Sequence, residues 1–342
     1  MVTHLAPGDP RWLGLINAHP DATIFHHPAW IGLIADCYRY RPTIVMVERG
    51  AAPGGGIPVI ETRSLLRGRR LVALPFSDAC APLVADDESL AELIGGLHAL
   101  RRERGCPQLE VRWGLPELPG VYPGAGALRH VTHLPDDPDE LFRRFHRTRV
   151  QQQIRVAEKS GLRVERAARW EDMADFYDLH LRTRRRHGVP VQPLRFFRLL
   201  WERLIGAGHG FLLLARDGNK AVAGALLLHW ARDLVYKFNA SDPLYWPMAP
   251  NHLLLWEALR QGCLDGYRSF DWGRTDTEHV GLRDFKRGWG AEEHPLRASI
   301  LADSPPDVRA SGASRTLMVH VIRRSPPWVC RALGELLYGQ LG

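Results

Sequence analysis

The sequence predicts an α/β protein of mixed sheets, built from two tandem domains and followed by an amphipathic helical tail. The chain has 342 residues, which is more than one hydrophobic core usually serves and suits two domains of about 150 residues each. The order of strands, turns and one helix in residues 43–113 recurs in residues 211–273. A repeat of this length indicates duplicated domains rather than a solenoid.

The first domain, residues 1–134, is expected to begin with a helix from Pro28 to Tyr38, because proline is favoured at the first position of a helix. Runs of β-branched residues and leucine, bounded by Gly, Asn or Asp, then predict strands. A helix with apolar residues at helical spacing precedes the last strand. In chain order these are strands at 43–50 and 57–65, a strand with an irregular loop at 70–82, a helix at 88–105 and a strand at 108–113.

The second domain, residues 135–301, follows a boundary near 134–138, where LPDDPDE consists of residues that favour turns. It is expected to open with one long helix at about 138–161 and a helical pair. The same series of strands and one helix then returns. The pair covers about 170–187 and 193–206, and the series covers 211–218, 221–230, 234–250, 251–266 and 268–273.

Residues 302–342 differ in composition from the rest of the chain. A linker rich in Pro, Ser and Ala precedes a segment that is apolar at helical spacing and carries arginines on its other side. A basic amphipathic helix of this kind covers the body of a protein or lies on a membrane surface. Both roles are open for this tail.

The composition is that of an ordinary globular protein, with 45% hydrophobic and 24% charged residues. The sequence holds no uncharged apolar run of the roughly 20 residues that a membrane span needs. The N-terminus lacks the basic and apolar regions of a secretory signal, so we expect a cytoplasmic protein. Five widely spaced cysteines without a C-x-x-C pair favour reduced thiols over a disulfide framework or a zinc ribbon.

The net charge of +7 comes mostly from arginine, whose planar fork suits phosphate, so an anionic partner fits the composition. The 16 histidines do not indicate a metal site. His26 and His27 are adjacent and would point to opposite sides of an extended segment. Neither H-x-x-x-H nor H-x-H with a carboxylate occurs, and we expect no catalytic metal.

The segment from Ser269 to Leu296 is the most informative part of the sequence. An apolar strand ends at Gly273 and leads into a polar loop, after which a short helix presents a lysine. A chain arranged in this way directs charge towards the mouth of a cleft. The loop carries Arg274, Asp276, Glu278 and His279, and the short helix carries Leu282, Phe285, Lys286 and Arg287.

Several motifs in this order resemble the Fem (FemAB-like) family of aminoacyl transferases, which consist of two domains of the GNAT acyltransferase fold. The resemblance is closest to their BioF-like acetyltransferase relatives, which often accompany cell-envelope or exopolysaccharide genes. It spans roughly residues 25–297, and the last motif is the most specific. The motifs are FHHPAW (25–30), LVALPFSDACAPLV (71–84), RTRVQQQIRVAEKSGLRVE (147–165), RTRRRHGVPVQP (182–193), APNHLLLWEAL (249–259) and FDWGRTDTEHVGLRDFKRGWG (270–290).

The resemblance implies two tandem GNAT-like domains and transfer of an aminoacyl or acyl group to an amine of a small molecule, a peptide or a cell-envelope precursor. GNAT domains that use acetyl-CoA normally carry R/Q-x-x-G-x-G/A, whose backbone N–H groups hold the pyrophosphate at a helix start. The corresponding loops at 75–89 and 239–252 lack those glycines. We therefore favour aminoacyl-tRNA over acyl-CoA as the donor and expect no permanently bound cofactor.

Two alternatives stay open. One is an acyl-CoA-dependent N-acetyltransferase of polysaccharide or envelope biosynthesis. The other is a non-catalytic protein that binds nucleic acid or assembles with partners, which the arginine-rich segment 143–155 would serve, although it lacks interleaved aromatic residues. The acceptor, the acyl group and the oligomeric state are not determined by the sequence.

In the site that the resemblance implies, Lys286 and Arg274 are the candidate catalytic residues. Lys286 would stabilise the developing oxyanion or bind a substrate phosphate. Arg274 would orient a phosphate or carboxylate, or would pair with Asp271 or Asp276. The candidate substrate-binding residues are Tyr236, Asn239, Asn251, His252, Asp271, Asp276, Glu278, Phe285, Ser77, Asp78 and Arg149.

Three expectations about these residues can be checked in a structure. We expect Lys286 to be an exposed lysine that points into a cleft near Arg274 and Tyr236, and to contribute less than about 1 kcal/mol to stability. Asn251 is expected to be the N-cap of its helix. The general base is open among His252, His279, Asp276 and Glu278.

Overall fold

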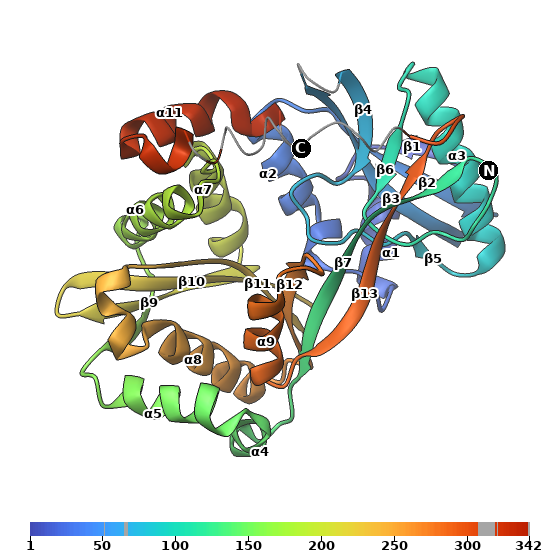
Figure 1. Ribbon diagram of the computed structural model, residues 1–342. Coiled ribbons are helices and arrows are strands. Elements are labelled where there is room, and N and C mark those ends of the chain that lie inside the picture. Colours follow the sequence, from blue (N-terminus) through green and yellow to red (C-terminus); the bar gives the residue numbers. More distant parts are fainter. Residues whose placement is uncertain (51, 65–67, 307–318, 320, 341–342) are drawn as a thin grey trace. The chain divides into compact units, whose positions relative to one another are not determined.

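Figure 1 shows a computed structural model of the protein, which describes all residues except 51, 65–67, 307–318, 320, 341 and 342. The chain forms two compact units. Unit 1 comprises Met1–Ala127, Pro295–Ala310 and Gly339–Gly342, and unit 2 comprises Leu128–His294 and Ser311–Tyr338. The sequence places residues 295–301 in the second domain, whereas they belong to unit 1 because their strand pairs there.

The sheet of unit 1 contains three antiparallel neighbours, β2, β3 and β4, with β1 at one edge of this group. A helix, α3 (Asp87–Glu103), connects β4 to β6, which pairs with β4 in parallel. The second half of β13 then pairs with β6 in antiparallel fashion. The strands are β1 (Val2–Leu5), β2 (Pro42–Arg49), β3 (Ala52–Ser64), β4 (Gly68–Ala73), the short β5 (Leu83–Val84), β6 (Leu109–Val111) and β13 (Glu292–Leu301), and the helices between β1 and β2 are α1 (Pro10–Ala18), η1 (Ile24–His26) and α2 (Pro28–Tyr38).

The sheet of unit 2 repeats this plan strand for strand. The strands β9, β10 and β11 are antiparallel neighbours, with β8 at the edge of the group. The helix α8 (Pro250–Leu264) connects β11 to the parallel β12, and the second half of β7 pairs with β12 in antiparallel fashion. The strands are β7 (Val121–His133), β8 (Arg163–Arg166), β9 (Gly210–Asp217), β10 (Lys220–Trp230), β11 (Asp233–Ser241) and β12 (Ser269–Thr275).

The equal strand orders confirm the predicted duplication. In both units a helix-containing segment precedes three antiparallel strands, and a helical crossover leads to a parallel fourth strand. The last strand of each half, β7 or β13, completes the sheet that the other half began. Periodicity in the sequence marks a strand but does not say which sheet it joins.

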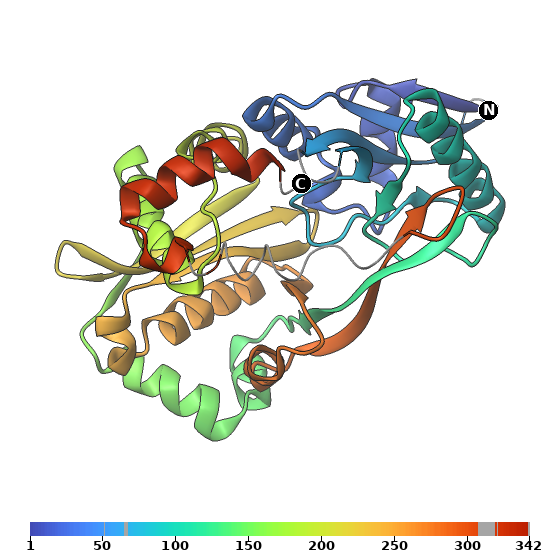
Figure 2. The same ribbon diagram turned by 45° about the horizontal axis from the view of Figure 1, so that its top comes forward.

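The core of unit 2 lies between its sheet and two helices, α6 (Trp170–His187) and α8, which contact β9, β10 and β11. The two helices lie on opposite faces of the sheet in Figure 1 and in the turned view of Figure 2. Because both faces are covered, β9 is buried from Gly210 to Arg216, and its residues up to Ala215 form a continuous apolar run. Further helices of unit 2 include α4 (Pro138–Arg144), η2 (Arg147–Gln151), α5 (Gln152–Glu158), α7 (Leu194–Leu200), η3 (Trp201–Ile205), η4 (Pro243–Met248), α9 (Val280–Gly288), α11 (Pro327–Leu337) and the start of η5 (Tyr338–Gln340).

The single long helix predicted at about 138–161 is wrong, because the chain breaks into α4, η2 and α5. Phe145 adopts an extended conformation and packs its ring 5.9 Å from Trp256 and 5.1 Å from Trp289. The next residue, His146, donates its backbone N–H to the carbonyl of Gly288 at 2.8 Å. These tertiary contacts outweigh the local helical preference. The helices predicted at 28–38 and 170–187 are confirmed with those bounds.

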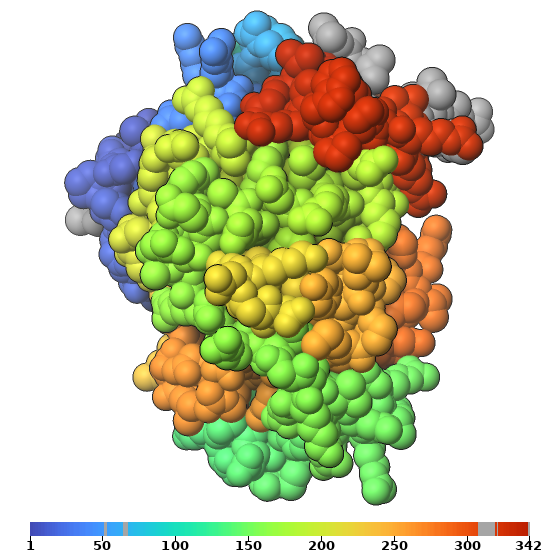
Figure 3. Space-filling view, turned by 90° about the vertical axis from the view of Figure 1, so that its left-hand side faces the viewer, coloured from blue at the N-terminus to red at the C-terminus, as the bar shows by residue number. Residues whose placement is uncertain are grey.

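The described part of the predicted tail covers unit 2, and residues 307–318, which include most of the predicted linker, lie outside the described residues. The helix α11 packs on α6, as the red and yellow-green surfaces in Figure 3 show. Arg331 lies 5.8 Å from the ring of Tyr177, and Arg185 Nε donates to the carbonyl of Ser325 at 2.7 Å. Among the described residues, no helix has the length and apolar character that crossing a membrane requires.

Candidate functional site

In unit 2 the sheet opens between β11 and β12. Their parallel ladder joins only Asp233–Val235 to Ser269–Asp271, and both strands continue beyond it. The predicted site residues Tyr236 and Asn239 lie on the part of β11 past the last paired residue. A bulge in β10 between Leu226 and Leu227 accompanies this divergence. The open ends of two strands and the start of α8 therefore meet in one region.

A pocket of about 190 Å³ lies at the N-terminus of α8. Three of the predicted site residues, Asn251, His252 and Phe285, line it. The other lining residues are Gln153, Trp246, Ala249 and Pro250. The sequence did not single out Gln153 or Trp246, because no local pattern indicates that α5 and η4 face the same space.

Side-chain amides form the polar part of this region. Asn239 Nδ2 donates to Asn251 Oδ1 at 3.2 Å, and Asn251 Nδ2 donates to Ser241 Oγ at 3.3 Å. Trp246 Nε1 donates to the same Ser241 Oγ at 3.0 Å. The prediction that Asn251 is the N-cap is wrong, because the cap is Ala249 with φ of 49° and Asn251 lies in the first turn. Its amide is thereby available to the network that fixes the pocket wall.

His252 forms the aromatic part of the pocket. Its ring stacks on Trp289 at 5.6 Å and meets Phe285 edge-on at 5.9 Å. Burial lowers the pKa of His252, and a hydrogen bond with the backbone of Arg149 opposes that shift. The imidazole is therefore neutral near pH 7 and can accept a proton. The predicted site residue Arg149 contributes through its backbone, while its side chain is exposed.

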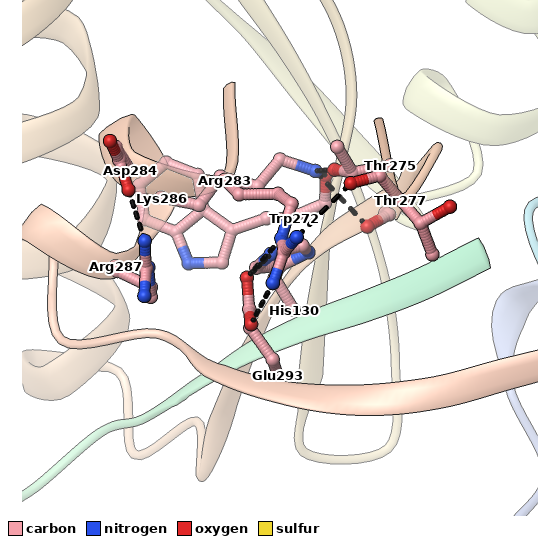
Figure 4. Close-up of polar contacts among 10 residues, drawn as sticks. His130, Trp272, Thr275, Thr277, Arg283, Asp284, Lys286, Arg287 and Glu293 are labelled. Carbon is pink, nitrogen blue, oxygen red and sulfur yellow. Dashed lines mark hydrogen bonds and ion pairs between the residues drawn. The ribbon is translucent and has the colours of Figure 1, made fainter. Parts of the chain in front are cut away.

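Lys286 is buried, with only 4% of its surface exposed, so the expectation of an exposed lysine is wrong. Its ammonium donates to the carbonyls of Trp272 at 2.8 Å and Gly273 at 3.1 Å, and to Thr275 Oγ1 at 2.7 Å (Figure 4). Gly273 has φ of 71°, a conformation that favours glycine and turns these carbonyls towards the lysine. Lys286 therefore ties α9 to the open end of β12, next to the pocket residue Phe285.

A second ionic group, also drawn in Figure 4, holds α9 to β13. Arg283 donates from Nε and Nη2 to the two carboxylate oxygens of Glu293, each at 2.9 Å, and from Nη1 to the carbonyl of Thr277. His130 Nε2 lies 3.1 Å from Glu293 Oε1. The hydrogen bond from Arg283 lowers the pKa of Glu293 to about 2. Burial lowers the pKa of His130, and the charge of Lys286 lowers it further.

The sequence did not indicate this group, because His130 and Glu293 are 163 residues apart. The two residues come together only when β7 and β13 are in place. The two parallel hydrogen bonds from Arg283 to Glu293 fix the orientation of α9 relative to β13.

The remaining predicted residues of unit 2 surround the open end of β12 without lining the pocket. Arg274 Nη2 lies 3.4 Å from Asp276 Oδ1, the structural pairing that the sequence left open. Asp271 accepts from Arg129 Nε at 2.7 Å. Tyr236 packs against Phe270 and Trp272, and burial raises the pKa of its hydroxyl. Glu278 is exposed in the loop before α9.

Ser77 and Asp78 belong to unit 1. Ser77 is buried, and its hydroxyl accepts from Trp30 Nε1 at 2.9 Å. Its carbonyl accepts from Arg112 Nη1 at 3.0 Å. Their role in acceptor binding stays a prediction. Within the described residues, no group of three or more His, Cys, Asp or Glu side chains is arranged to hold a metal ion.

Comparison with known proteins relates this site to acyl transfer. Residues 144–287, which include the pocket and most of α9, match the family model of an acetyltransferase (GNAT) domain. Curated relatives are lipid II:glycine glycyltransferases of Staphylococcus haemolyticus, 23% identical, and of Staphylococcus epidermidis, 24% identical. Each match covers 47% of this chain and 54% of the relative, so the chain spans about half the length of the curated relatives it matches.

Solved structures share the fold at low sequence identity. FemX is 16% identical with a TM-score of 0.69, and the match covers 87% of this chain and 96% of FemX. L-PGS from Bacillus licheniformis is 12% identical with a TM-score of 0.57, covering 93% of this chain and 97% of that structure. A tandem GNAT protein from the clavulanic acid biosynthesis pathway is 13% identical with a TM-score of 0.52, covering 90% and 99%. The predicted tandem GNAT fold and the resemblance to the Fem family are confirmed.

Proposed function

We propose that this Fem-like protein of the GNAT fold transfers an aminoacyl or acyl group to an amine, with the pocket at the start of α8 holding the reacting acyl end. The observation that carries the proposal is the coincidence of three features in unit 2. The parallel ladder opens after Val235, the N-terminus of α8 faces a pocket, and a neutral histidine lines that pocket. The curated relatives are named for transfer of glycine to lipid II, which supports an amine of a cell-envelope precursor as the acceptor.

In the transfer step the acceptor nitrogen attacks the carbonyl carbon of the donor, a new C–N bond forms, and the bond from carbon to the leaving oxygen or sulfur breaks. The attacking amine loses one proton and the leaving group gains one. His252 is the group we assign to take the proton, because its imidazole is neutral and its ring is fixed between Trp289 and Phe285. The positive end of the α8 dipole favours the negative charge that develops on the carbonyl oxygen.

Aminoacyl-tRNA is the donor we favour. The segment between β11 and α8 contains Pro243 and Pro247 and no glycine, and α8 itself begins at Pro250. Since proline lacks a backbone N–H, this loop offers fewer donors for a pyrophosphate than the glycine-rich loop of CoA-dependent GNAT domains. We expect acetyl-CoA to bind no tighter than about micromolar. A tRNA donor would place the reaction in the cytoplasm and would need no permanently bound cofactor.

Lys286 and Arg274 retain proposed catalytic roles of different kinds. The buried ammonium of Lys286 is bound to the carbonyl of Trp272, whose ring packs against the pocket residue Phe285, and its charge can stabilise the oxyanion electrostatically. Arg274 is half-buried and shares its guanidinium with Asp276 at the edge of the site. It can turn to a substrate phosphate or carboxylate at small cost, because such a pair is partly exposed to water.

An acyl-CoA-dependent N-acetyltransferase of envelope or polysaccharide biosynthesis is the second candidate function, and the acetyltransferase family model supports it. The same pocket and the same histidine would serve that reaction. Only the donor differs, so a comparison of donors separates the two.

The test is a transfer assay with purified protein, using glycyl-tRNA or acetyl-CoA as the donor and a panel of amine-bearing envelope precursors. Replacing His252 by Gln should lower kcat by about 10²-fold and remove the acidic limb of the pH profile, because a general base is lost. His279→Gln is the matched control, since His279 is exposed and does not line this pocket. Equal effects of the two substitutions would rule out His252 as the base. Turnover with acetyl-CoA alone would favour the second candidate, and no turnover with either donor would remove both.

A further inference from the structure

The short helix η4 exposes large apolar side chains beside the pocket. Leu244 has 82% of its surface exposed and Trp246 has 51%. Pro243 and Pro247 are exposed as well. An exposed leucine next to an exposed tryptophan is a costly arrangement unless something covers it part of the time.

The neighbours of these side chains hold η4 in shape. Asp242 caps the helix by accepting from the backbone N–H of Leu244 at 3.1 Å. Tyr245 and Met248 pack on the hydrophobic core, and Trp246 is tethered to Ser241. Tyr245 and Met248, which are three residues apart, thus point inward, and Leu244 is held outward on a fixed protrusion.

Cationic side chains surround this protrusion. Lys220 Nζ lies 4.9 Å from the ring centre of Tyr245, and the Arg186 guanidinium lies 5.1 Å from that of Trp246. Arg182 lies 3.9 Å from Asp242. Lys220 and Arg182 are about half exposed. The carboxylate of Asp242 faces these three cations, which outnumber it, so this group of side chains carries a net positive charge.

We propose that η4 docks on the surface of an anionic lipid bilayer. Leu244 and Trp246 would enter the boundary between headgroups and acyl chains, where tryptophan is favoured. Lys220, Arg182 and Arg186 would face the lipid phosphates, each cation adding to the attraction. The protrusion is one short helix, much smaller than the roughly 800 Å² per partner of a stable protein interface, so a bilayer suits it better than a folded protein.

This docking deepens the proposed function, because Trp246 belongs both to the exposed surface and to the pocket lining. A bilayer that contacts η4 would lie at the mouth of the pocket. The acceptor would then be an amine carried by a membrane lipid, a conclusion that rests on the proposed transfer activity. The docking itself does not depend on it.

The helix α11 provides a matched control within the same unit. Its Leu336 is 74% exposed, close to the value for Leu244, and it lies on the amphipathic tail that the sequence also suggests for a membrane surface. Leu336 takes part in no pocket described here, and neither does Leu244. The same substitution at the two positions therefore separates docking through η4 from docking through the tail.

The experiment is co-sedimentation of the full chain with vesicles of phosphatidylcholine, with and without phosphatidylglycerol. The wild-type protein should bind the anionic vesicles and bind them less at high salt, because exposed charges are screened. Leu244→Glu should weaken this binding by about tenfold, since an apolar contact is lost and a like charge is placed against the lipid. Leu336→Glu should bind as the wild type does.

Three outcomes would overturn the proposal: no binding of the wild type to anionic vesicles, equal binding to neutral vesicles, or a loss confined to Leu336→Glu. A gel shift with tRNA that weakens only in Leu244→Glu, without vesicle binding, would assign the surface to nucleic acid instead. Transfer to a water-soluble amine distinguishes docking from chemistry. Leu244→Glu should keep that transfer, and a wild type that docks but transfers nothing would refute the proposed function alone.

Discussion

The two units share one strand order but differ where their parallel strands end. In unit 2, β12 is followed by α9, which brings Lys286 back onto β12. In unit 1 the residues after β6 form an extended, proline-containing segment, 114–120, without a helix. Both strands lead into a Trp-Gly pair, Trp113-Gly114 and Trp272-Gly273, so the two halves begin alike and then diverge.

The segments that follow β4 in unit 1 and β11 in unit 2 also differ between the two units. In unit 1 the chain turns sharply after β4, with positive φ at Leu74 and Phe76, and buries Ser77 and Cys80. Trp30 donates to Ser77, and His26 lies 3.0 Å from the carbonyl of Ala81. In unit 2 the corresponding segment is η4, which is exposed and borders a pocket.

The comparison separates the elements that the two copies of the fold share from those in which they differ. The sheet and its crossover helix are common to both copies because they form the core. The loops at the ends of the strands carry the differences, as expected for a scaffold that holds a site on its loops. We therefore propose that the chemistry takes place in unit 2.

The largest expected effect comes from removing Lys286, because unit 1 has no counterpart of the helix α9 that carries it. Lys286→Ala should lower turnover by about 10²-fold or more, since a preorganised positive charge near the reacting carbonyl is lost. It should also lower the free energy of unfolding by about 1.5–3 kcal/mol, because buried hydrogen bonds from a charged group are removed. Steady-state kinetics and urea unfolding measure the two effects. Lys286→Arg should not restore activity, because the planar guanidinium cannot reach the same three oxygens.

Lys159→Ala is the control for that substitution, since Lys159 is exposed at the end of α5. It should change neither turnover nor stability by a measurable amount. A folded Lys286→Ala protein with wild-type turnover would show that the lysine is only a structural tie.

The second prediction concerns a property in which the units should agree. Each has a fully buried histidine whose pKa is lowered by burial, His26 to about 4 and His180 to about 3. A histidine with a lowered pKa binds its proton less readily in the folded state, so its folded form loses stability as the pH falls below about 6.5. Each of these two histidines should contribute a loss of about 2 kcal/mol to its unit between pH 7 and pH 5.

Hydrogen exchange on the paired strands β2–β3 and β9–β10 would report each unit separately across this pH range. A loss in one unit only would mean that the other protonates its histidine without unfolding, and the agreement between units would not hold.

Local sequence signals predicted the helices but not the contacts that make the site. The start of α2 follows from Pro28. The end of α6 follows from Gly188, whose left-handed conformation stops the helix. The break at Phe145 depends on Trp256 and Trp289, which are distant in sequence. The helical preference of a short segment contains no information about such distant contacts, so it could not predict the break.

The same reason explains the site residues. The short helix with Phe285 and Lys286 was predicted from its apolar spacing and its glycine-broken strand, and it forms α9. The sequence did not predict that Lys286 points inward, because this direction depends on carbonyls that Gly273 turns towards the helix. The contact of His130 with Glu293 requires two strands, β7 and β13, that are far apart in the sequence.

The smallest expected effects come from replacing one buried tryptophan by Phe in each unit, which tests whether the two units have different roles. Trp30 donates its indole N–H to Ser77 Oγ at 2.9 Å in unit 1, and Trp272 donates to Thr132 Oγ1 at 2.9 Å in unit 2. Replacing either by Phe removes one buried hydrogen bond. Each variant should lose about 1 kcal/mol of stability, measured by urea unfolding.

The two substitutions should differ in activity. Trp272 also packs against the pocket residue Phe285 at 6.3 Å, and its carbonyl accepts from Lys286. Trp272→Phe should therefore lower kcat severalfold, because small displacements of positioning groups reduce turnover. Trp30→Phe should keep the wild-type kcat, since it changes only the buried segment of unit 1. If Trp30→Phe lowers kcat as much as Trp272→Phe at equal stability, unit 1 takes part in the reaction and the assignment of chemistry to unit 2 alone is wrong.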